Sequence, residues 1–300
     1  MLLLFLSVLL SVVTCAPTLN LDPFVGSIPG AHSVPDYETV PMFTDSSATP
    51  TESYQQFLYP ISTDDNVVVH KYILENPRST FSFKPPIGLC GNLSHVRDSA
   101  QHYNCSTAFN AGFFDMKAGF CIGYLISDGK IFNSGGFSGA FFGITKDFNY
   151  VMGYVTQQML ESQMFLHGVQ GIVYLVRNGQ VYVNESIKQE GTSPAFVNQL
   201  AARIAIGHDA DGRLVILQVD GYSPIRYGVD LHTFAEICKS FELVNAVNID
   251  GGGSISFLYQ GSLKNSCSDD CPEFSEGRRC SIPFGGSKCL RRVSSFICIK

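Results

Sequence analysis

The sequence predicts a mixed α+β fold, in which a strand-rich sheet core carries a few helices and is stapled by disulfides into a single domain. Short apolar runs that alternate with polar residues recur along the chain, and Gly or Asn-Gly steps separate them. Helical spacing of apolar residues is confined to a few short stretches. The chain also has ten cysteines and begins with an apolar leader, which is typical of proteins from an oxidising compartment.

The predicted elements follow in order along the chain. Strands are expected near residues 67–74, 105–114, 122–127, 139–145 and 153–155, and helices near 156–166, 194–200 and 230–241. Two hairpins are expected, over 171–186 and 201–221. The first turns at Asn178-Gly179, a dipeptide typical of tight hairpin turns, and the second turns at 209–212.

The N-terminal part of the chain is expected to lie outside the folded domain. Residues 1–15 are interpreted as a signal peptide, because an apolar run of about 13 residues is too short to span a bilayer. Residues 16–66 contain seven acidic residues but no Lys or Arg, and predict a flexible pro-region or spacer. The domain itself is expected over 67–300, with a cysteine-rich tail at 265–300.

Length, composition and charge limit the classes of protein to which this chain could belong. Three hundred residues, 45% of them hydrophobic, suffice for one large domain or two small ones. The formal net charge of −6 and the lack of a basic cluster argue against nucleic-acid binding. The arginine pairs at 278–279 and 291–292 are expected on solvated faces.

Nine cysteines remain once Cys15 is assigned to the leader, and most are expected to form disulfides. Cys238 lies in the predicted helix 230–241 and is expected to be a buried free thiol. The tail cysteines allow three internal connectivities, and without His or paired C-x-x-C spacing they do not predict zinc; these are Cys267, Cys271, Cys280 and Cys289. No metal or cofactor is expected. Three sequons predict N-glycosylation, at Asn92, Asn104 and Asn184.

The stretch VNAVNIDGGGSISFLY, residues 244–259, places an aspartate on three glycines between two predicted strands. A phosphate-binding loop needs a helix after its glycines, so this stretch is not one. A glycine-rich turn with a chance aspartate is the alternative. Similar polar residues beside glycines end other predicted strands, and the candidate site residues are Asn110, Gly112, Arg203, Gly207, His208, Asp220, Asp250, Gly251, Gly252, Gly253 and Ser254.

Five blocks in one order resemble the phosphodiester glycosidase family over about residues 70–300. They are NAGFF at 110–114, SDGK with GG between 127 and 136, GIVYLVRNGQVYVNES at 171–186, ARIAIGHD at 202–209 and VNAVNIDGGGS at 244–254. The family usually has a glycine where this chain has Ala111, and a positive φ there would strain an alanine.

The resemblance implies hydrolysis of N-acetylglucosamine-α-1-phosphodiesters, which would remove GlcNAc and expose mannose 6-phosphate on glycans of lysosomal enzymes. The substrates would be phosphorylated high-mannose glycoproteins. A phosphate leaving group has a second pKa of about 6 and needs little protonation to depart, whereas a fixed cation stabilises its charge. The alternatives are a glycosidase of another sugar-1-phosphodiester and a secreted, non-catalytic carbohydrate-binding protein.

Within that resemblance, Asp250 is the expected nucleophile or base and Asp220 the second carboxylate. Arg203, with His208, is expected to hold the phosphate. The expected substrate-binding residues are Asn110, Gly112, Gly207, Gly251, Gly252, Gly253 and Ser254.

The resemblance also implies disulfides Cys90–Cys121 and Cys105–Cys298, with two more pairs among the four tail cysteines. Animal members of the family carry a membrane-spanning helix that has no counterpart in these residues. A soluble protein without a membrane anchor, in the lumen of the secretory pathway (Golgi) or secreted, is therefore expected.

Overall fold

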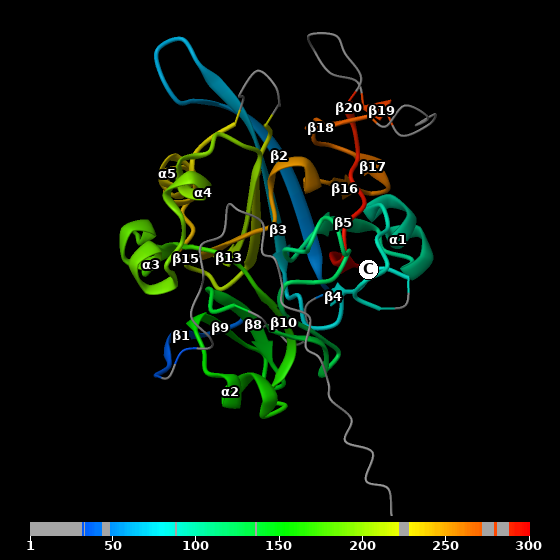
Figure 1. Ribbon diagram of the computed structural model, residues 1–300, viewed down its shortest axis with the longest axis vertical. Coiled ribbons are helices and arrows are strands. Elements are labelled where there is room, and N and C mark those ends of the chain that lie inside the picture. The colour runs from blue at the N-terminus through cyan, green and yellow to red at the C-terminus, as the bar shows by residue number, and fades with distance from the viewer. Residues whose placement is uncertain are drawn as a thin grey trace, which may run out of the picture.

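The computed structural model describes residue 32 and residues 34–43, 49–87, 89–135, 137–221, 228–271, 279–280 and 288–300. The predicted signal peptide lies outside these residues. In the described part, strands dominate and a few helices pack on them (Figure 1), as the sequence predicted.

A seven-stranded sheet forms the centre of the fold, and all its neighbouring strands are antiparallel. Its middle strands are buried along their whole length. The strand order is β12 (Gln180–Val181), β11 (Tyr174–Arg177), β15 (Asn245–Ile249), β13 (Arg203–His208), β14 (Leu214–Val219), β3 (Asn66–Glu75) and β2 (Thr51–Pro60).

Three further antiparallel sheets surround the central one. The six-stranded sheet has the order β1 (Asp36–Pro41), β9 (Asn149–Tyr154), β8 (Phe141–Thr145), β10 (Phe165–Gln170), β6 (Gly123–Ser127) and β7 (Lys130–Gly135). The five-stranded sheet has the order β17 (Ser262–Leu263), β16 (Phe257–Tyr259), β5 (Thr107–Asn110), β21 (Phe296–Ile299) and β4 (Phe81–Lys84). The smallest sheet has the order β18 (Asp269–Asp270), β20 (Lys288–Cys289) and β19 (Arg279–Cys280).

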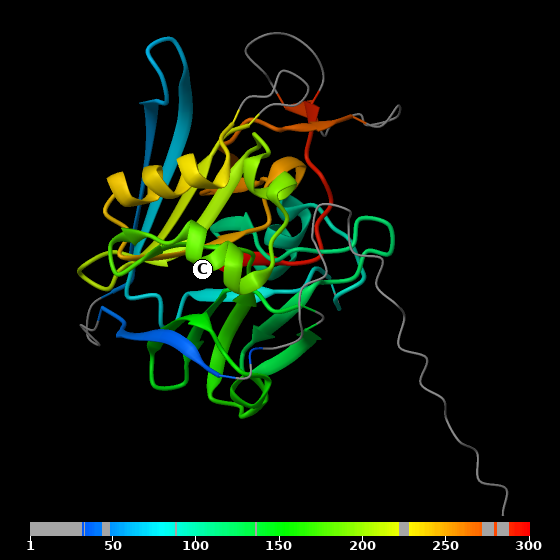
Figure 2. The same cartoon turned by 60° about the vertical axis from the view of Figure 1, so that its left-hand side comes forward.

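Helices cover one face of the central sheet. Helices α3 (Val183–Glu190), α4 (Pro194–Asn198) and α5 (Leu231–Ser240) lie together on that face (Figures 1 and 2). The Asp230 carboxylate accepts a hydrogen bond from the Thr233 amide at 2.7 Å, so α5 begins with a capping residue and confirms the predicted helix. Helix α1 (Val96–Tyr103) packs on the five-stranded sheet, and α2 (Gln157–Glu161) connects β9 to β10.

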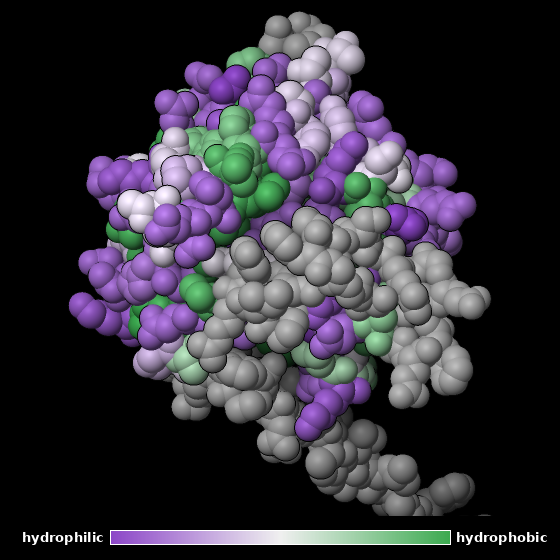
Figure 3. Space-filling model, turned by 90° about the horizontal axis from the view of Figure 1, so that it is seen from above, coloured by the Kyte–Doolittle hydropathy of each residue, from purple (hydrophilic) through white to green (hydrophobic). Residues whose placement is uncertain are grey.

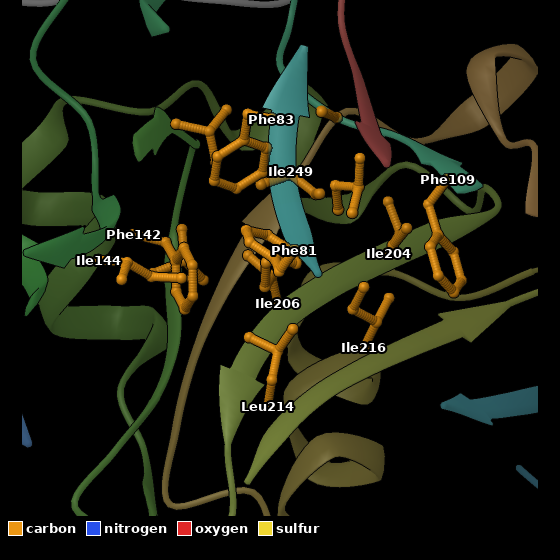
Figure 4. Close-up of a cluster of buried hydrophobic side chains, with 14 of the residues drawn as sticks. Phe81, Phe83, Phe109, Phe142, Ile144, Ile204, Ile206, Leu214, Ile216 and Ile249 are labelled. Atoms are coloured by element: carbon orange, nitrogen blue, oxygen red, sulfur yellow. The ribbon is translucent and has the colours of Figure 1, made fainter. Parts of the chain in front are cut away.

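The two faces of the central sheet contribute to different apolar cores. Ala205, Val215 and Ala246 face the helices. The residues that alternate with them, such as Ile204, Ile206, Ile216 and Ile249, face the other sheets and pack with Phe81, Phe83 and Phe109 (Figure 4). Successive strand side chains point to opposite faces, so this alternation decides which polar residues at the strand ends can meet.

The prediction of a flexible segment over 16–66 is wrong for two stretches, which form strands β1 and β2. Strand β2 pairs through all ten of its residues with β3, and β1 pairs with β9. Arg177 binds the carboxylates of Asp36 at 2.6 Å and Glu38 at 2.9 Å. Composition misled here because strand pairing orders both stretches and Arg177 offsets the acidic residues of β1.

Other elements differ locally from the prediction. The hairpin at Asn178-Gly179 is confirmed, with φ of 51° and 73°, but residues 183–190 form helix α3 instead of extending the strand. The helix predicted over 156–166 is only five residues long, and Phe165 already starts β10. Helix α1 was not predicted.

The covalent links agree with the expectation. Disulfides join Cys90 to Cys121, Cys105 to Cys298 and Cys271 to Cys289, and Cys267 is also disulfide-bonded. The side chain of Cys280 lies outside the description. Among the described residues Cys238 is the free thiol, and it is buried.

The coloured part of the face that Figure 3 shows is mostly polar. Seen from above, apolar side chains gather in only a few patches (Figure 3). Asn92, Asn104 and Asn184 are exposed, and their glycosylation stays a prediction. None of the helices in the described ranges has the length and apolar character needed to cross a bilayer.

Candidate functional site

A cavity of about 300 Å³ lies where β13 begins and β15 ends. These strands are antiparallel neighbours with Ile204 opposite Ile249, so the next residues outward, Arg203 and Asp250, stand side by side. The volume is at the lower end of the range for small-molecule sites. The lining residues are Phe113, Phe114, Met116, Ile122, Phe137, Ile172, Phe196, Gln199, Ala201, Arg203, Asp250, Gly251, Gly252, Gly253, Ser254 and Arg291.

The glycine run turns tightly beneath the cavity. Residues Gly252–Ser254 form a single 3₁₀ turn, and β16 starts only at Phe257, so the strand predicted from Ser254 begins later. Gly252 has a φ of +56° and its amide donates to the Ala202 carbonyl at 2.8 Å. The glycines therefore bend the chain back at once after Asp250 and leave its carboxylate at the cavity.

Asp250 is half-buried and presents its carboxylate to the cavity. Burial raises its pKa to about 7, against the smaller opposing effects of the Ser254 hydroxyl, the Arg291 charge and the Gly251 amide. Asp250 Oδ2 is buried and has no hydrogen-bond partner in the described residues. The same holds for Ser254 Oγ, which lies near enough to lower the pKa of Asp250 without reaching hydrogen-bonding geometry. Both groups are placed to bind a ligand.

Arg203 lines the cavity, but backbone carbonyls already accept hydrogen bonds from two of its guanidinium nitrogens. Its Nε donates to the Val229 carbonyl at 3.2 Å, and its Nη2 donates to the carbonyls of Gln199 at 2.6 Å and Phe196 at 3.2 Å. Burial lowers its pKa to about 10, so it keeps its charge at neutral pH. Arg203 thus supplies positive charge to the cavity wall, and its hydrogen bonds hold the end of α4 and the residue that follows it.

Arg291 is a cationic group that sequence reasoning missed. Its Nε and Nη2 bind both carboxylate oxygens of Asp269, at 2.8 and 3.0 Å. A Cβ added to Gly253 would lie 2.3 Å from Arg291 Nη2 and 2.6 Å from its Cζ, so the guanidinium packs directly on that glycine. The expectation of a solvated pair holds for Arg292, which is exposed, but is wrong for Arg291.

The structure assigns a supporting position to Asn110. Its Nδ2 donates to the Asp250 carbonyl at 2.5 Å and its Oδ1 accepts from the Ser256 amide at 3.0 Å. Both ends of the amide hold the backbone around the glycine run and the residue does not line the cavity, so its position does not support the expected contact with sugar. Ala111 is not among the residues with positive φ, which removes the expected strain. Gly112 binds Ser295 Oγ through its amide at 2.9 Å and does not line the cavity.

His208 and Gly207 also lie away from the cavity. His208 is at the other end of β13 and on the opposite face, where Nδ1 meets the Asp209 carbonyl at 2.8 Å and Nε2 meets Asn245 Nδ2 at 2.9 Å. A Cβ on Gly207 would lie 2.0 Å from the Asn245 carbonyl oxygen, so this glycine allows close strand packing. The roles expected for both residues are not supported by their positions.

Asp220 faces the side of the sheet away from Asp250. One oxygen binds His70 Nε2 at 3.1 Å and the other accepts from the Ser266 amide at 3.1 Å. The structure therefore does not bring the two predicted carboxylates together. Within the described ranges no three His, Cys, Asp or Glu side chains converge to hold a metal ion.

Comparisons with known proteins agree with this architecture. A profile of the phosphodiester glycosidase family matches residues 103–281. N-acetylglucosamine-1-phosphodiester α-N-acetylglucosaminidase from Mus musculus is 35% identical over 247 residues, and that from Homo sapiens is 35% identical over 250 residues; these cover 78% and 79% of this chain. The matches span less than half of those proteins, 46% of each.

A solved structure matches as well. The catalytic domain of the zebrafish N-acetylglucosamine-1-phosphodiester α-N-acetylglucosaminidase, auto-inhibited by its pro-peptide, superposes with a TM-score of 0.76 at 31% identity and covers 88% of this chain and 87% of that one. A hypothetical protein from Synechocystis, 16% identical with a TM-score of 0.58, shares the fold. The chain belongs to the phosphodiester glycosidase family.

Proposed function

We propose that this chain hydrolyses N-acetylglucosamine-α-1-phosphodiesters, releasing GlcNAc and leaving the phosphate on its other partner, as in mannose 6-phosphate on glycans of lysosomal enzymes. The observation that carries this proposal is a single carboxylate beside two arginines: within the described residues, Asp250 is the one acidic residue that lines the cavity, with Arg203 and Arg291. Ordinary glycosidases use a pair of carboxylates. A phosphate leaving group, with a second pKa of about 6, needs little protonation to depart.

In this reaction the bond between the anomeric carbon and the phosphate oxygen breaks, and a water oxygen ends on the anomeric carbon. Ionised Asp250 acts on the anomeric carbon as nucleophile, or on the attacking water as base. The departing phosphate gains charge, and Arg291 stabilises it at the cavity mouth while Arg203 contributes from the wall. In this proposal the Ser254 hydroxyl and the backbone of Gly251 to Gly253, which line the cavity, bind sugar hydroxyls or the acetamido group.

The test measures free GlcNAc released from GlcNAc-α-phosphate-α-methylmannoside. We expect turnover by the wild type and a loss of at least ~100-fold in Asp250→Asn. Asp147→Asn, which changes an exposed aspartate away from the cavity, is the matched control and should keep wild-type activity. Saturable binding of the diester without any hydrolysis by the wild type would instead favour a non-catalytic carbohydrate-binding protein.

The proposed setting is the lumen of the secretory pathway or the extracellular space. The disulfides among the described residues, including Cys90–Cys121 and Cys105–Cys298, need an oxidising compartment. The exposed sequon asparagines fit the same route. Phosphorylated high-mannose glycoproteins are the proposed substrates in that setting.

A further inference from the structure

Exposed apolar side chains project from two loops beside the cavity mouth. We call these loops, residues 89–93 and 113–122, the lip. Leu89, Met116 and Phe120 are 59%, 56% and 55% exposed. Single exposed apolar residues are common on protein surfaces, but several close together beside a pocket indicate a binding surface.

The lip is held rigidly. The Cys90–Cys121 disulfide joins its two loops, and the Asp115 amide binds the Phe120 carbonyl at 2.9 Å to close the turn. The Phe120 ring packs on Gly91, where an added Cβ would lie 3.1 Å from the ring. Because the backbone is fixed before any ligand arrives, little ordering cost remains to be met on binding.

Met116 connects the lip to the cavity. It lines the cavity and is also exposed, and its Sδ accepts a contact from Arg291 Nη1 at 3.6 Å. In the proposed reaction the GlcNAc ring lies at Asp250 and the phosphate at Arg291. Met116, which contacts Arg291, then lies beside the group on the far side of the phosphate.

We infer that the lip is a subsite for the sugar on the far side of the phosphate, an inference that rests on the proposed function. A pyranose ring has faces of C–H groups, which pack on an aromatic ring or a thioether, and Phe120 and Met116 offer both. Leu89, next to the disulfide, extends the apolar surface outward. The lip therefore contributes to the binding of the leaving glycan, and the cavity to the binding of GlcNAc.

The test compares two diesters of GlcNAc-α-1-phosphate, one with a methyl group and one with α-methylmannoside on the far side. Phe120→Ala and Leu89→Ser should each raise KM for the mannoside ~3- to 10-fold with kcat within about twofold, and leave KM for the methyl diester unchanged. Phe120→Tyr should retain the wild-type KM. Leu58→Ser is the control, because Leu58 is exposed on β2, the third strand from β13.

Equal KM values for the mannoside in all variants, or equal increases for both diesters, would overturn the inference. An effect seen only with intact glycoproteins would also overturn it and would indicate docking of the polypeptide. If the wild type hydrolysed neither diester, the proposed function itself would fail. Calorimetric titration with a mannose 6-phosphate oligosaccharide would then decide: weaker binding by Phe120→Ala supports the subsite, and equal binding refutes it.

Discussion

At Asp250 burial and charge act in opposite directions. Burial raises the pKa of Asp250 to about 7, whereas an exposed aspartate is fully ionised at neutral pH. The nearby Arg291 favours the ionised form, and a substrate phosphate bound to Arg291 would weaken that effect. The protonation state of this one side chain thus controls the proposed chemistry.

The first prediction concerns pH. If ionised Asp250 acts as nucleophile or base, kcat/KM should increase as pH rises through about 7 and level off above it. The measurement is a pH profile of GlcNAc release from the methyl diester, with the fold checked at each pH by circular dichroism. A rate that is flat from pH 5 to 8 would exclude an essential ionisation at Asp250.

The second prediction concerns stability. The pKa of Asp250 is raised in the folded protein, so its contribution to the free energy of unfolding is fully present below about pH 4 and is lost as pH rises through about 7. Asp250→Asn has no such ionisation. The change in unfolding free energy that the substitution causes should therefore be more favourable at pH 8 than at pH 4.5, by about 1–4 kcal/mol. Urea unfolding at both pH values measures the difference. An effect of the substitution that is no more stabilising at pH 8 than at pH 4.5 would contradict it.

The third prediction concerns Arg291, whose planar fork is held by Asp269. Arg291→Lys keeps the charge but loses the fork and the packing on Gly253, so kcat/KM for the mannoside diester should fall ~10- to 100-fold. Arg292→Lys is the matched control, since Arg292 is exposed and does not line the cavity. Full activity in Arg291→Lys would indicate that another positively charged side chain stabilises the departing phosphate.

At the scale of elements, the glycine run after Asp250 depends on neighbouring segments that are far apart in sequence. Asn110 at the end of β5 holds the backbone of Asp250 and Ser256, and Asp269 from β18 orients Arg291. Ser268 Oγ donates to the Gly252 carbonyl at 2.6 Å, which links the loop after β17 to the glycine run. These segments, distant in sequence, therefore hold the backbone around the glycine run and the arginine that packs on it.

The fourth prediction tests that support. Asn110→Asp is isosteric and can still accept from the Ser256 amide, but it cannot donate to the Asp250 carbonyl and adds a negative charge nearby. We expect a loss of stability of about 1–3 kcal/mol and a fall in kcat of at least ~10-fold, because the glycine turn shifts. Thermal unfolding and single-turnover kinetics measure the two effects. Unchanged kcat would show that the loop holds its shape without this bond.

At the scale of the whole molecule, the last strand closes the fold. Strand β21 lies between β5 and β4 in the five-stranded sheet, and Cys298 is linked to Cys105 across a sequence separation of 193 residues. The end of the cysteine-rich tail, residues 265–300, is thus an integral part of the domain. A link across so long a loop removes much of the freedom of the unfolded chain.

The fifth prediction follows from this link. The Cys105→Ser and Cys298→Ser double variant should lose about 2–5 kcal/mol of stability in denaturant unfolding. The Cys90→Ser and Cys121→Ser variant, which opens a separation of only 31 residues, is the comparison and should lose less. A larger loss in the second variant would show that native-state packing at the lip, and not chain entropy, dominates.

The sequence by itself determined the strand-rich fold class, the hairpins at Asn178-Gly179 and 209–212, helix α5 and the turn that presents Asp250. These depend on local chemistry: alternating apolar residues, residues that accept positive φ and a capping aspartate. The resemblance to the family added the disulfides Cys90–Cys121 and Cys105–Cys298. Most of what concerned a single short segment was therefore predictable.

Only the tertiary structure decided which predicted residues meet. Strand alternation places Arg203 and Asp250 on one face and His208 and Asp220 on the other, although all four follow similar local patterns. Arg291 enters the cavity because the chain returns through the tail, and β1 is ordered by β9, a partner far along the chain. Pairing between distant segments has no local signature, since it depends on which backbone hydrogen bonds and charges the folded chain brings together.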